Sequence, residues 1–453
     1  YIQGAEGDSV EFHQLGPGIP GSWRGVTFYG GIASGSIIQH FYIENGVNNI
    51  LIEGSSPSFY GIHSHAASEN GILIRDGDPV FHDLKISQHI SIDSRHGLYA
   101  VNSGVEIYGG KVRGARPNGE EGLKFVQNST PLVHNVDVRD AYNNGILIQD
   151  CGEGLITGCS IEETGLRGIN VENSNEIEIS YNLVHRIVGA GIRVSAVSLS
   201  DIHHNTIVNT GYTGQFSDGI FVSGICTLLQ IHSNIITDCE GYGINATQTA
   251  ITSRYSCYDS NAFGAYGGNA VGGTGDIEAD PLLFGMDYEL TGESPCIDTG
   301  HNALNYNDPD GTRGDMGWKF FNQNQPPVIE SYVPELDLLS GYSWGDVVDF
   351  SVTARDPENH TLTYRWYYMN QLRSELTTAS ITLLNTEAGL DSVYVEVNDH
   401  YYAGITVRRW YVDAVPVSEE KQSLVPGEFA ISSIYPNPFN SITVVTVAVP
   451  RPG

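Results

Sequence analysis

Four polar residues of this sequence recur at equivalent places behind a repeated glycine. Lys124, Asn170 and Arg193 each lie two residues after a glycine, and Glu172 lies four residues after one. If these places point outward from one sheet, the four side chains form a mixed charged patch. Cleavage of an acidic sugar polymer by elimination needs a base for the proton at C5 of the sugar and a cation for its carboxylate. Lys124, Glu172 and Arg193 are therefore candidate catalytic residues, and Asn170 is a candidate for substrate binding.

Further candidates surround this patch. The same places behind the glycines hold Tyr99 and Gln149, which we expect to contact a substrate. The loops that enter these strands supply carboxylates that suit calcium as oxygen ligands: Glu120, Glu121, Asp140, Glu162 and Glu163. An ordinary solvated surface also carries charged side chains, so that interpretation stays open beside the catalytic one.

The glycine belongs to a repeat that runs through the first half of the chain. It opens short segments such as GILIQDC at 145–151 and GINVENS at 168–174, and it returns every 22 to 28 residues. The repeated positions are Gly25, Asn49, Gly71, Gly97, Gly122, Gly145, Gly168, Gly191, Gly219 and Gly243. Asparagine in place of glycine at position 49 fits a backbone of positive φ. Such self-similarity predicts a solenoid.

Aliphatic residues inside each unit indicate strands. Ile156, Ile179 and Ile202 lie 23 residues apart, and apolar positions alternate with polar ones. An alternation of period two is typical of strands, and no unit has the helical period of 3.6. Each unit is therefore expected to form one coil of a parallel β-helix, and ten coils at a strand spacing of about 4.8 Å give a rod roughly 45–50 Å long. Equivalent asparagines are expected to stack as an interior ladder: Asn182, Asn205 and Asn234.

These coils resemble the secreted right-handed parallel β-helix proteins, the group that contains pectate lyases, polygalacturonases and alginate lyases. The resemblance covers residues 1 to about 320. Beyond the coils, DIEADPLLF, YELTGESPCIDTG and DPDGTRGDMG at 308–317 look like the ending of bacterial members. The resemblance implies a polysaccharide groove on the outward face of one sheet. It specifies neither the polymer nor catalysis.

Motifs of particular enzyme groups are incomplete in this chain. NGEEGLKFVQNS at 118–129 partly resembles the Asn-Gly-Glu calcium motif of one alginate and chondroitin lyase group. Gly122 and Gln127 stand where that group has a second acid and its catalytic lysine. His96 and the glycine after it resemble the His-Gly pair of polygalacturonases, yet the chain has no Asp-Asp pair to supply the acids.

The pattern changes after the linker QPP at 325–327, where consecutive prolines favour extended backbone. Short alternating segments such as VDFSVTAR and SVYVEV follow, and they predict a β-sandwich over residues 326–414. The segment ARDPENHTLTYRW at 354–366 resembles the Asp-Pro-Glu turn of cadherin-like and polycystic-kidney-disease-type Ig-like modules. In such relatives these carboxylates sometimes bind calcium, which makes Asp356 and Glu358 candidate ligands. A plain turn is the alternative.

A polar linker at 415–428 precedes a last segment at 429–453, which contains YPNPFN. This core resembles the opening of the C-terminal sorting module of type IX secretion substrates, which continues in relatives for several more strands. The resemblance implies export across the outer membrane of a Gram-negative bacterium, attachment at the cell surface, and the type IX secretion machinery as a partner. Because the chain begins with Tyr1 and stops at Gly453, we expect a mature form or a fragment with an incomplete sorting module.

The chain is strongly acidic, with 22 Lys and Arg residues against 53 Asp and Glu and a formal net charge of −31. This balance excludes nucleic acid and anionic lipid as expected partners, because both need clustered cations. It also disfavours a polyuronate substrate unless calcium bridges the two, and calcium is the only cofactor we expect. No stretch approaches the ~18 apolar residues of a membrane-spanning helix. An extracellular polysaccharide or a cell-surface glycan is the expected partner.

The six cysteines form no C-x-x-C pair, which argues against zinc sites and thioredoxin-like chemistry. Cys257 and Cys296 fall in the segment that closes the β-helix, where no further coil covers the core. Export permits oxidation, so we predict a disulfide between these two residues, with their Cα atoms within about 7 Å. Buried thiols are the expectation for Cys151, Cys159 and Cys226.

The sequence thus predicts an all-β protein: a right-handed parallel β-helix at 1–320, an Ig-like β-sandwich at 326–414 and the incomplete sorting module. Two functions stay open. The first, which we favour, is a cell-surface protein that binds polysaccharide or acts in adhesion without catalysis. The second is a polysaccharide lyase or glycoside hydrolase that works in a groove on the outward face of the β-helix.

Overall fold

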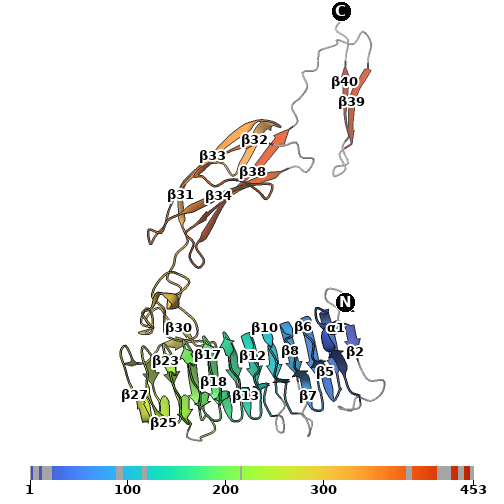
Figure 1. The fold of residues 1–453 in the computed structure, drawn as a ribbon. Coiled ribbons are helices and arrows are strands. Elements are labelled where there is room, and N and C mark those ends of the chain that lie inside the picture. The colour runs from blue at the N-terminus through green and yellow to red at the C-terminus, as the bar shows by residue number, and fades with distance from the viewer. Residues whose placement is uncertain are drawn as a thin grey trace, which may run out of the picture. The chain divides into compact units, whose positions relative to one another are not determined.

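A computed structural model of the chain describes residues 2–3, 10–12, 23–87, 95–114, 120–214, 217–383, 390–415, 430–436 and 443–448. The chain divides into two compact units, residues 1–323 and 324–453. Figure 1 draws the coils of the first unit from blue to yellow and the strands of the second in orange and red. No helix among the described residues is long and apolar enough to cross a membrane.

The first unit is a parallel β-helix built on two sheets. One sheet has 11 strands, and each pairs in parallel with its counterparts in the coils before and after. Its strands are β3 (Val26–Tyr29), β5 (Asn48–Glu53), β7 (Asn70–Arg75), β9 (Leu98–Val101), β11 (Leu123–Val126), β13 (Asn144–Gln149), β16 (Arg167–Glu172), β19 (Ile192–Ser195), β22 (Ile220–Ser223), β25 (Ile244–Thr252) and β27 (Tyr266–Val271). The first ten are the segments predicted behind the repeated glycine, and β27 is a further strand that the repeat did not predict.

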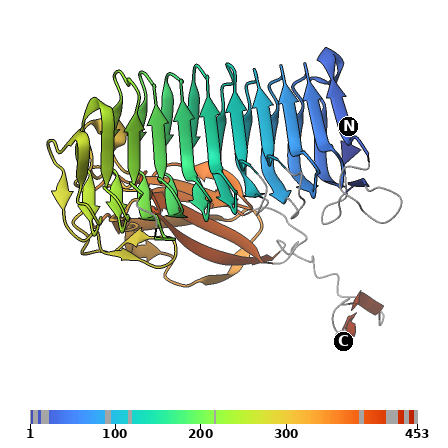
Figure 2. The same cartoon turned by 90° about the horizontal axis from the view of Figure 1, so that it is seen from below.

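The other sheet has 17 strands and forms the rest of each coil; Figure 2 shows strands of successive coils side by side. Its strands are β1 (Ile2–Gln3), β2 (Val10–Phe12), β4 (Ile37–Glu44), β6 (Ser58–His65), β8 (Val80–Ser87), β10 (Glu106–Arg113), β12 (Leu132–Arg139), β14 (Gly154–Thr157), β15 (Ser160–Glu162), β17 (Ile177–Ser180), β18 (Leu183–Ile187), β20 (Asp201–His203), β21 (Thr206–Thr210), β23 (Gln230–His232), β24 (Ile235–Thr237), β26 (Cys257–Asp259) and β28 (Ile277–Glu278). A left-handed residue bends the coil within or between these strands, as at Asp83 (φ 53°) and Tyr181 (φ 54°). A short helix α1 (Gly30–Ala33) follows β3.

Aliphatic side chains fill the interior of the coils. One column consists of residues in direct register on successive strands, all fully buried: Ile146, Ile169, Ile192 and Ile220. Burying such side chains is the main stabilising contribution to a core of this kind. The stacked columns confirm the predicted parallel β-helix.

The repeated glycine has a packing role rather than a conformational one. A Cβ atom at Gly168 would lie 2.5 Å from Cγ1 of Val184 and 2.6 Å from the carbonyl oxygen of Gly191. Most of the repeated positions, Asn49 among them, do not have a positive φ, so our expectation of one is wrong there. Asn49 is fully buried instead, and its amide donates to the carbonyl of His65 at 2.7 Å.

The expected asparagine ladder is present and fully buried. The backbone N–H of Asn182 donates to Oδ1 of Asn205 at 3.0 Å, and that of Asn205 donates to Oδ1 of Asn234 at 3.0 Å. Cys159 occupies the equivalent place one coil earlier, where its N–H donates to Oδ1 of Asn182 at 2.9 Å. The left-handed residue at this bend is the one before each asparagine, for example His204 (φ 50°).

A segment after β28 closes the end of the β-helix. It contains the antiparallel pair β29 (Leu283–Phe284) and β30 (Glu289–Leu290) and the 3₁₀ helix η1 (Leu304–Tyr306). Cys257 and Cys296 lie in one small core here, but the structure holds all six cysteines as free thiols rather than forming the expected disulfide. A hydrogen bond with Cys257 and burial raise the pKa of Cys296, so the two thiols are in contact and their oxidation stays a prediction.

The second unit has one core between two sheets. The first sheet has the order β31 (Val328–Val333), β33 (Val347–Arg355) and β36 (Thr378–Thr382), and the second has the order β32 (Leu338–Ser343), β38 (Ile405–Val415), β37 (Asp391–Asn398), β34 (Thr363–Tyr368) and β35 (Gln371–Ser374). All pairs are antiparallel except β32 with β38. Rings from both sheets meet in the core, with centroids 5.2 Å apart for Phe350 and Trp410. A sandwich has this arrangement, and the Ig-like relationship stays a prediction.

Near the C-terminus, β39 (Ala430–Pro436) and β40 (Thr443–Ala448) form an antiparallel pair. Residues 437–440, which complete YPNPFN, and residues 416–428 of the expected linker lie outside the described residues. The sorting module therefore stays a prediction.

Candidate functional site

The outward face of the 11-stranded sheet carries a column of side chains, one from each coil. Five residues are in direct register on β9, β11, β13, β16 and β19: Tyr99, Lys124, Leu147, Asn170 and Arg193. A second column two residues further along the strands includes Gln149 and Glu172. Spacing behind the glycine therefore placed these residues on one face, but the structure divides them into two clusters.

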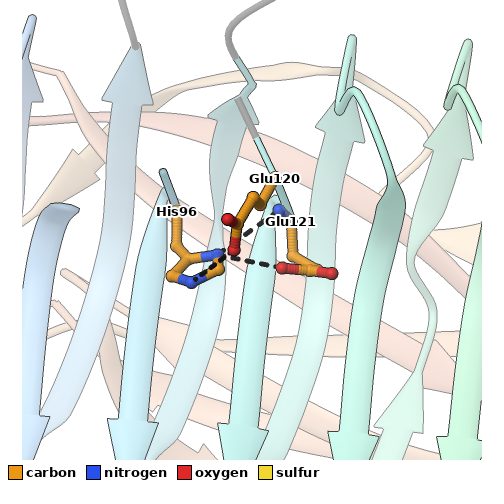
Figure 3. Close-up of side chains that lie close together, drawn as sticks. All are labelled: His96, Glu120 and Glu121. Atoms are coloured by element: carbon orange, nitrogen blue, oxygen red, sulfur yellow. Dashed lines mark hydrogen bonds and ion pairs between the residues drawn. The ribbon is translucent and has the colours of Figure 1, made fainter. Parts of the chain in front are cut away.

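The first group, which we call the His96 cluster, consists of His96, Tyr99, Glu120, Glu121 and Lys124. Figure 3 shows both glutamates beside the imidazole of His96. Oε2 of Glu121 lies 2.9 Å from Nδ1, and Oε2 of Glu120 lies 3.2 Å from Nε2. Nζ of Lys124 lies 3.5 Å from the same Nε2 and 5.1 Å from the ring centroid of Tyr99. The cluster thus brings an acid, an imidazole, an amine and a phenol together on adjacent coils.

Burial and charge act in opposite directions on Glu121, which is 7% exposed. Burial raises the pKa of its carboxyl group, but the interactions with His96, Lys124 and Asn144 outweigh burial and leave the pKa below its ordinary value. Glu121 is therefore a buried carboxylate that is ionised at neutral pH. Glu120, by contrast, has a side chain that is 45% exposed.

The donor set of the His96 cluster suits calcium poorly. Potential ligand atoms of His96, Glu120 and Glu121 lie within 4.8 Å of one another. Calcium prefers oxygen ligands, whereas one of these three donors is a nitrogen. The ammonium group of Lys124 also lies 3.9 Å from Oε2 of Glu121, where it already supplies positive charge.

The second group, the Arg193 triad, consists of Asn170, Glu172 and Arg193. Arg193 donates to Oδ1 of Asn170 at 3.1 Å and forms an ion pair with Glu172, and Nδ2 of Asn170 donates to Oε1 of Glu172 at 3.2 Å. Leu147, 7% exposed, separates the triad from Lys124. A guanidinium group held by its own glutamate is not available to bind a substrate carboxylate. Arg193 therefore lacks the property that the predicted catalytic role requires.

The remaining loop carboxylates do not assemble around one point. Oε2 of Glu162 lies 2.7 Å from Nη1 of Arg139, and Oε1 of Glu163 lies 2.6 Å from Nη2 of Arg186. Asp140 occupies a left-handed corner of its coil, with φ 59°. Among the described residues, neither Asp140 nor these two glutamates gather with other potential ligands as a metal site would require.

A further column of side chains precedes the repeated glycine, and of its members only His96 and Glu121 are candidates from the sequence. Asn144 and Arg167 are in register on β13 and β16, one coil after the other, and Nδ2 of Asn144 donates to Oε1 of Glu121 at 3.1 Å. His96, Glu121, Asn144 and Arg167 each stand immediately before a repeated glycine. A survey of the residue before the glycine, rather than after it, finds all four.

A second group of potential metal ligands lies in the second unit. Atoms of Asp356, His360 and Asp399 lie within 4.8 Å of one another. Glu358 does not join them, because its Oε2 accepts the backbone N–H of Gln325 at 3.3 Å. Oδ1 of Asp356 accepts the N–H groups of Glu358 and His360 at 2.9 and 2.8 Å, which is the geometry of a turn. Calcium binding by Asp356 and Glu358 stays a prediction, and the structure places Asp356 with His360 and Asp399 instead.

Comparison with known proteins gives one family match and several partial likenesses. A sequence profile described as "Right handed beta helix region" matches residues 48–207 and 121–280, which together span just over half of the chain. Pectate lyase Pel9A is 12% identical, with a TM-score of 0.40 over 64% of this chain and 97% of that one. The Azotobacter vinelandii mannuronan C-5 epimerase AlgE6 A-module is 15% identical, with a TM-score of 0.35 over 60% and 90%. The periplasmic alginate epimerase AlgG is 13% identical, with a TM-score of 0.34 over 56% and 73%.

Proposed function

The chain belongs to the right-handed β-helix family, and from this premise we propose that it binds an extracellular polysaccharide along the outward face of the 11-stranded sheet. The observation that carries the proposal is the column on β9 to β19, which presents one outward side chain per coil. A ligand that contacts such a column repeatedly must itself be a repeating polymer.

The spacing and chemistry of the column support a sugar polymer. Successive coils lie about 4.8 Å apart, so the face from Lys124 to Arg193 spans roughly 15 Å, enough for two or three sugar rings. Tyr99 offers an aromatic ring, and Asn170 and Gln149 offer amides that can bind hydroxyl groups. A binding groove needs this combination of apolar and polar groups.

The proposal includes a location outside the cell. The motif YPNPFN supports export by the type IX machinery and attachment at the surface of a Gram-negative bacterium. A surface glycan of the same or a neighbouring cell is then the partner, and adhesion is the outcome of binding it. The unusually acidic composition, with a net charge of −31, agrees with a protein that does not bind nucleic acid.

Immobilised polysaccharides test the proposal directly. The purified chain should bind at least one of pectin, alginate and a panel of neutral glycans, and Tyr99→Ala should weaken that binding by about tenfold, because a sugar-contacting aromatic ring contributes on the order of 1 kcal/mol or more. Tyr60→Ala is the matched control, since Tyr60 is exposed on the outward face of the other sheet. Failure to bind any polymer, or equal losses in both variants, would overturn the proposal.

The His96 cluster supports a second candidate function, a polysaccharide lyase. Oε2 of Glu121 faces Nδ1 of His96 and holds the imidazole near Lys124. In an elimination, one of these bases removes the C5 proton, the C4=C5 double bond forms, the C4–O4 bond breaks, and the leaving oxygen takes up a proton. Histidine and lysine side chains can perform both proton transfers.

Ultraviolet absorbance of unsaturated uronates distinguishes catalysis from binding alone. A lyase should release them from a polyuronate, and Lys124→Ala or His96→Ala should reduce the rate at least a hundredfold, the usual contribution of a general acid or base, about 10² or more. New reducing ends without unsaturated products would indicate a glycoside hydrolase instead. Binding without either product leaves the first function alone supported.

A further inference from the structure

The column before the repeated glycine contains an arginine that its surroundings do not satisfy. Arg167 is half-buried at the start of β16, and among the described residues its guanidinium makes no hydrogen bond and no ion pair. Burial and the nearby charge of Arg193 lower the pKa of Arg167, which Glu172 only partly offsets. A half-buried cation in this state is stabilised by any anion that reaches it.

A second unsatisfied group lies beside it, one coil away. Asn144 is 4% exposed, and while its Nδ2 donates to Glu121, its Oδ1 has no partner. A buried acceptor without a donor costs free energy, and a ligand hydroxyl or amide would recover it. Asn144 and Arg167 are in register, so the orphan acceptor and the unsatisfied donors lie side by side on one face.

We propose that Asn144 and Arg167 form the subsite that recognises an acidic sugar, with the anionic group of the sugar on Arg167 and a hydroxyl group of the same or the next ring on Oδ1 of Asn144. This inference rests on the proposed function and adds the substrate class, a glycan that carries carboxylate or sulfate groups. Arg167 is a specificity-determining residue in this account, because its planar guanidinium matches a carboxylate or sulfate through two parallel hydrogen bonds.

On the side of the next coil, the residue beside Arg167 is apolar in its own column and charged in the neighbouring one. The next residue of the column is Ala190, which carries no polar side chain. Arg193 is already held by Glu172 and Asn170, so it adds positive field without competing for the substrate as a donor. Lys124 stands two coils before Asn170, roughly 10 Å away along the sheet, within reach of a neighbouring sugar.

The acidic composition does not contradict an acidic ligand. A net charge of −31 belongs to the whole chain, and charges beyond about 10 Å are largely screened at physiological salt. Near the subsite the charges are those of Lys124, Arg167 and Arg193 against Glu121 and Glu172. Asp218 stands in the same column two coils after Arg167, where its carboxylate accepts the backbone N–H of Tyr242 and a hydrogen bond from Nδ2 of Asn245. Because all three carboxylates are engaged with their own partners, the uncompensated charge at this place is the positive one on Arg167.

Polymers that differ only in charge provide the test. We compare pectate with fully methyl-esterified pectin, alginate with its propylene glycol ester, and chondroitin sulfate with desulfated chondroitin, using the full chain and equilibrium binding. The wild type should prefer at least one acidic member by tenfold or more, and added salt should weaken that preference. The carboxylate and sulfate pairs show which anion the site takes.

Substitutions then assign the preference to the subsite. Arg167→Ala should reduce the acid-to-neutral preference at least fivefold with little change for the neutral polymer, and Arg167→Lys should recover only part of it. Arg113→Ala is the matched control, because Arg113 is exposed on β10 of the other sheet. Arg167→Gln, which retains a polar side chain, replaces the alanine variant if that variant unfolds at a lower temperature.

The outcomes separate this inference from the proposed function. Equal binding of the acidic and neutral members of every pair leaves polysaccharide binding intact and overturns the acidic subsite. An acidic preference that survives both Arg167→Ala and Arg167→Gln also overturns it, since another residue must then hold the anion. Binding to no polymer overturns the proposed function itself.

Discussion

At the scale of single residues, the His96 cluster shows how a buried carboxylate remains ionised. Glu121 would be costly to ionise in an apolar interior, yet His96, Lys124 and Asn144 surround its carboxylate. In the same cluster Nδ1 of His96 lies beside Glu121, and its Nε2 lies beside Glu120 and Lys124. The geometry of the cluster therefore depends on the charge of one carboxylate.

Glu121→Gln should destabilise the protein at neutral pH. A hydrogen bond to a charged group contributes about 1.5–3 kcal/mol, so the variant should lose an amount of that order at pH 7. The pKa of Glu121 is below its ordinary value of 4.5 in the folded state, so its contribution is present above that value and is lost as the pH falls through the folded pKa. Urea unfolding should show the stabilities of the two proteins converging as the pH falls below 4.5.

Glu53→Gln serves as the control for this comparison. Glu53 ends β5 on the same face of the sheet, three coils before the strand β11 that follows Glu121. It should change the free energy of unfolding by less than about 0.5 kcal/mol, as a surface substitution does. A Glu121→Gln variant as stable as the wild type at pH 7 would show that the cluster does not hold this carboxylate.

Residue spacing predicted which side chains share a face, but not how they pair. Lys124, Asn170 and Arg193 follow from the period of the repeat, because every coil repeats the same outward positions. The ion pair of Arg193 with Glu172 depends on side-chain rotamers, which the period does not determine. Arg167 escaped notice because a residue before a glycine was not recognised as part of the outward face.

At the scale of the coil, hydrogen bonds between equivalent residues of successive coils hold the polar side chains of the interior in place. Nδ2 of Asn205 donates to the carbonyl of Ile179 at 2.8 Å, and its Oδ1 accepts the backbone N–H of Asn182 at 3.0 Å. Nδ2 also donates to the carbonyl of His203 at 3.0 Å in its own coil, so one asparagine satisfies backbone groups in two coils. The sequence predicted the ladder from spacing alone, since three asparagines at equivalent places have few other ways to be satisfied in an apolar core.

Asn205→Ala should be among the most destabilising single substitutions in the β-helix. It leaves the N–H of Asn182 and the carbonyl of Ile179 buried without partners, at about 1–3 kcal/mol each. We expect a total loss on the order of 2–4 kcal/mol in chemical denaturation, given that such effects are not fully additive. The control is Asn269→Ala, at an exposed asparagine of β27, which should lower the free energy of unfolding by less than about 0.5 kcal/mol. Similar losses of stability in the two variants would refute the structural role of the ladder.

The repeated glycine shows where coil-scale prediction failed. The recurrence itself is a correct prediction, but the expected positive φ is found at Gly25 and not at Gly168 or most of the other repeated positions. The structural reason is the distance from a Cβ to the next coil, 2.6 Å to the carbonyl oxygen of Gly191. Close approach between coils is a tertiary property, so the sequence pattern by itself did not distinguish the two causes.

At the scale of the first unit, the closing segment packs on coils that are distant in sequence. The N–H of His301 donates to Oγ of Ser233 at 2.9 Å, and that of Trp318 donates to Oγ1 of Thr206 at 3.1 Å, across 68 and 112 residues. Repeat period says nothing about such contacts. These contacts bring together a group of rings: His203, His204, His232, His301 and Tyr306. Of these, only His203 and His232 are expected to stack from their equivalent places on adjacent coils, and they do, with centroids 5.0 Å apart.

His204 is the most deeply buried of these imidazoles, 1% exposed. Burial and the neighbouring His203, His232 and His301 hold its pKa well below the ordinary value of 6.5. The carboxylates nearest to the group contact its other members, Glu178 at 3.3 Å from Nε2 of His203 and Asp201 at 3.4 Å from Nε2 of His232. His204 therefore stays neutral in the folded protein at pH values where the same residue of the unfolded chain would bind a proton.

The wild type should consequently lose stability on acidification in a way that His204→Gln does not. Below pH 6.5 the unfolded chain binds a proton at this residue that the folded protein does not, so the free energy of unfolding falls as the pH falls. The pKa values of His63 and His185, which burial lowers to about 4, add in the same direction in both proteins. Those of Asp308 and Asp315, which burial raises, act in the opposite direction, again in both proteins, and cancel in the comparison.

Melting temperatures from pH 7 to pH 5 should therefore fall further for the wild type than for His204→Gln. The control His134→Gln, on the outward face of β12, should follow the wild type. Parallel curves for the wild type and His204→Gln would show that the closing segment does not keep this imidazole from its proton.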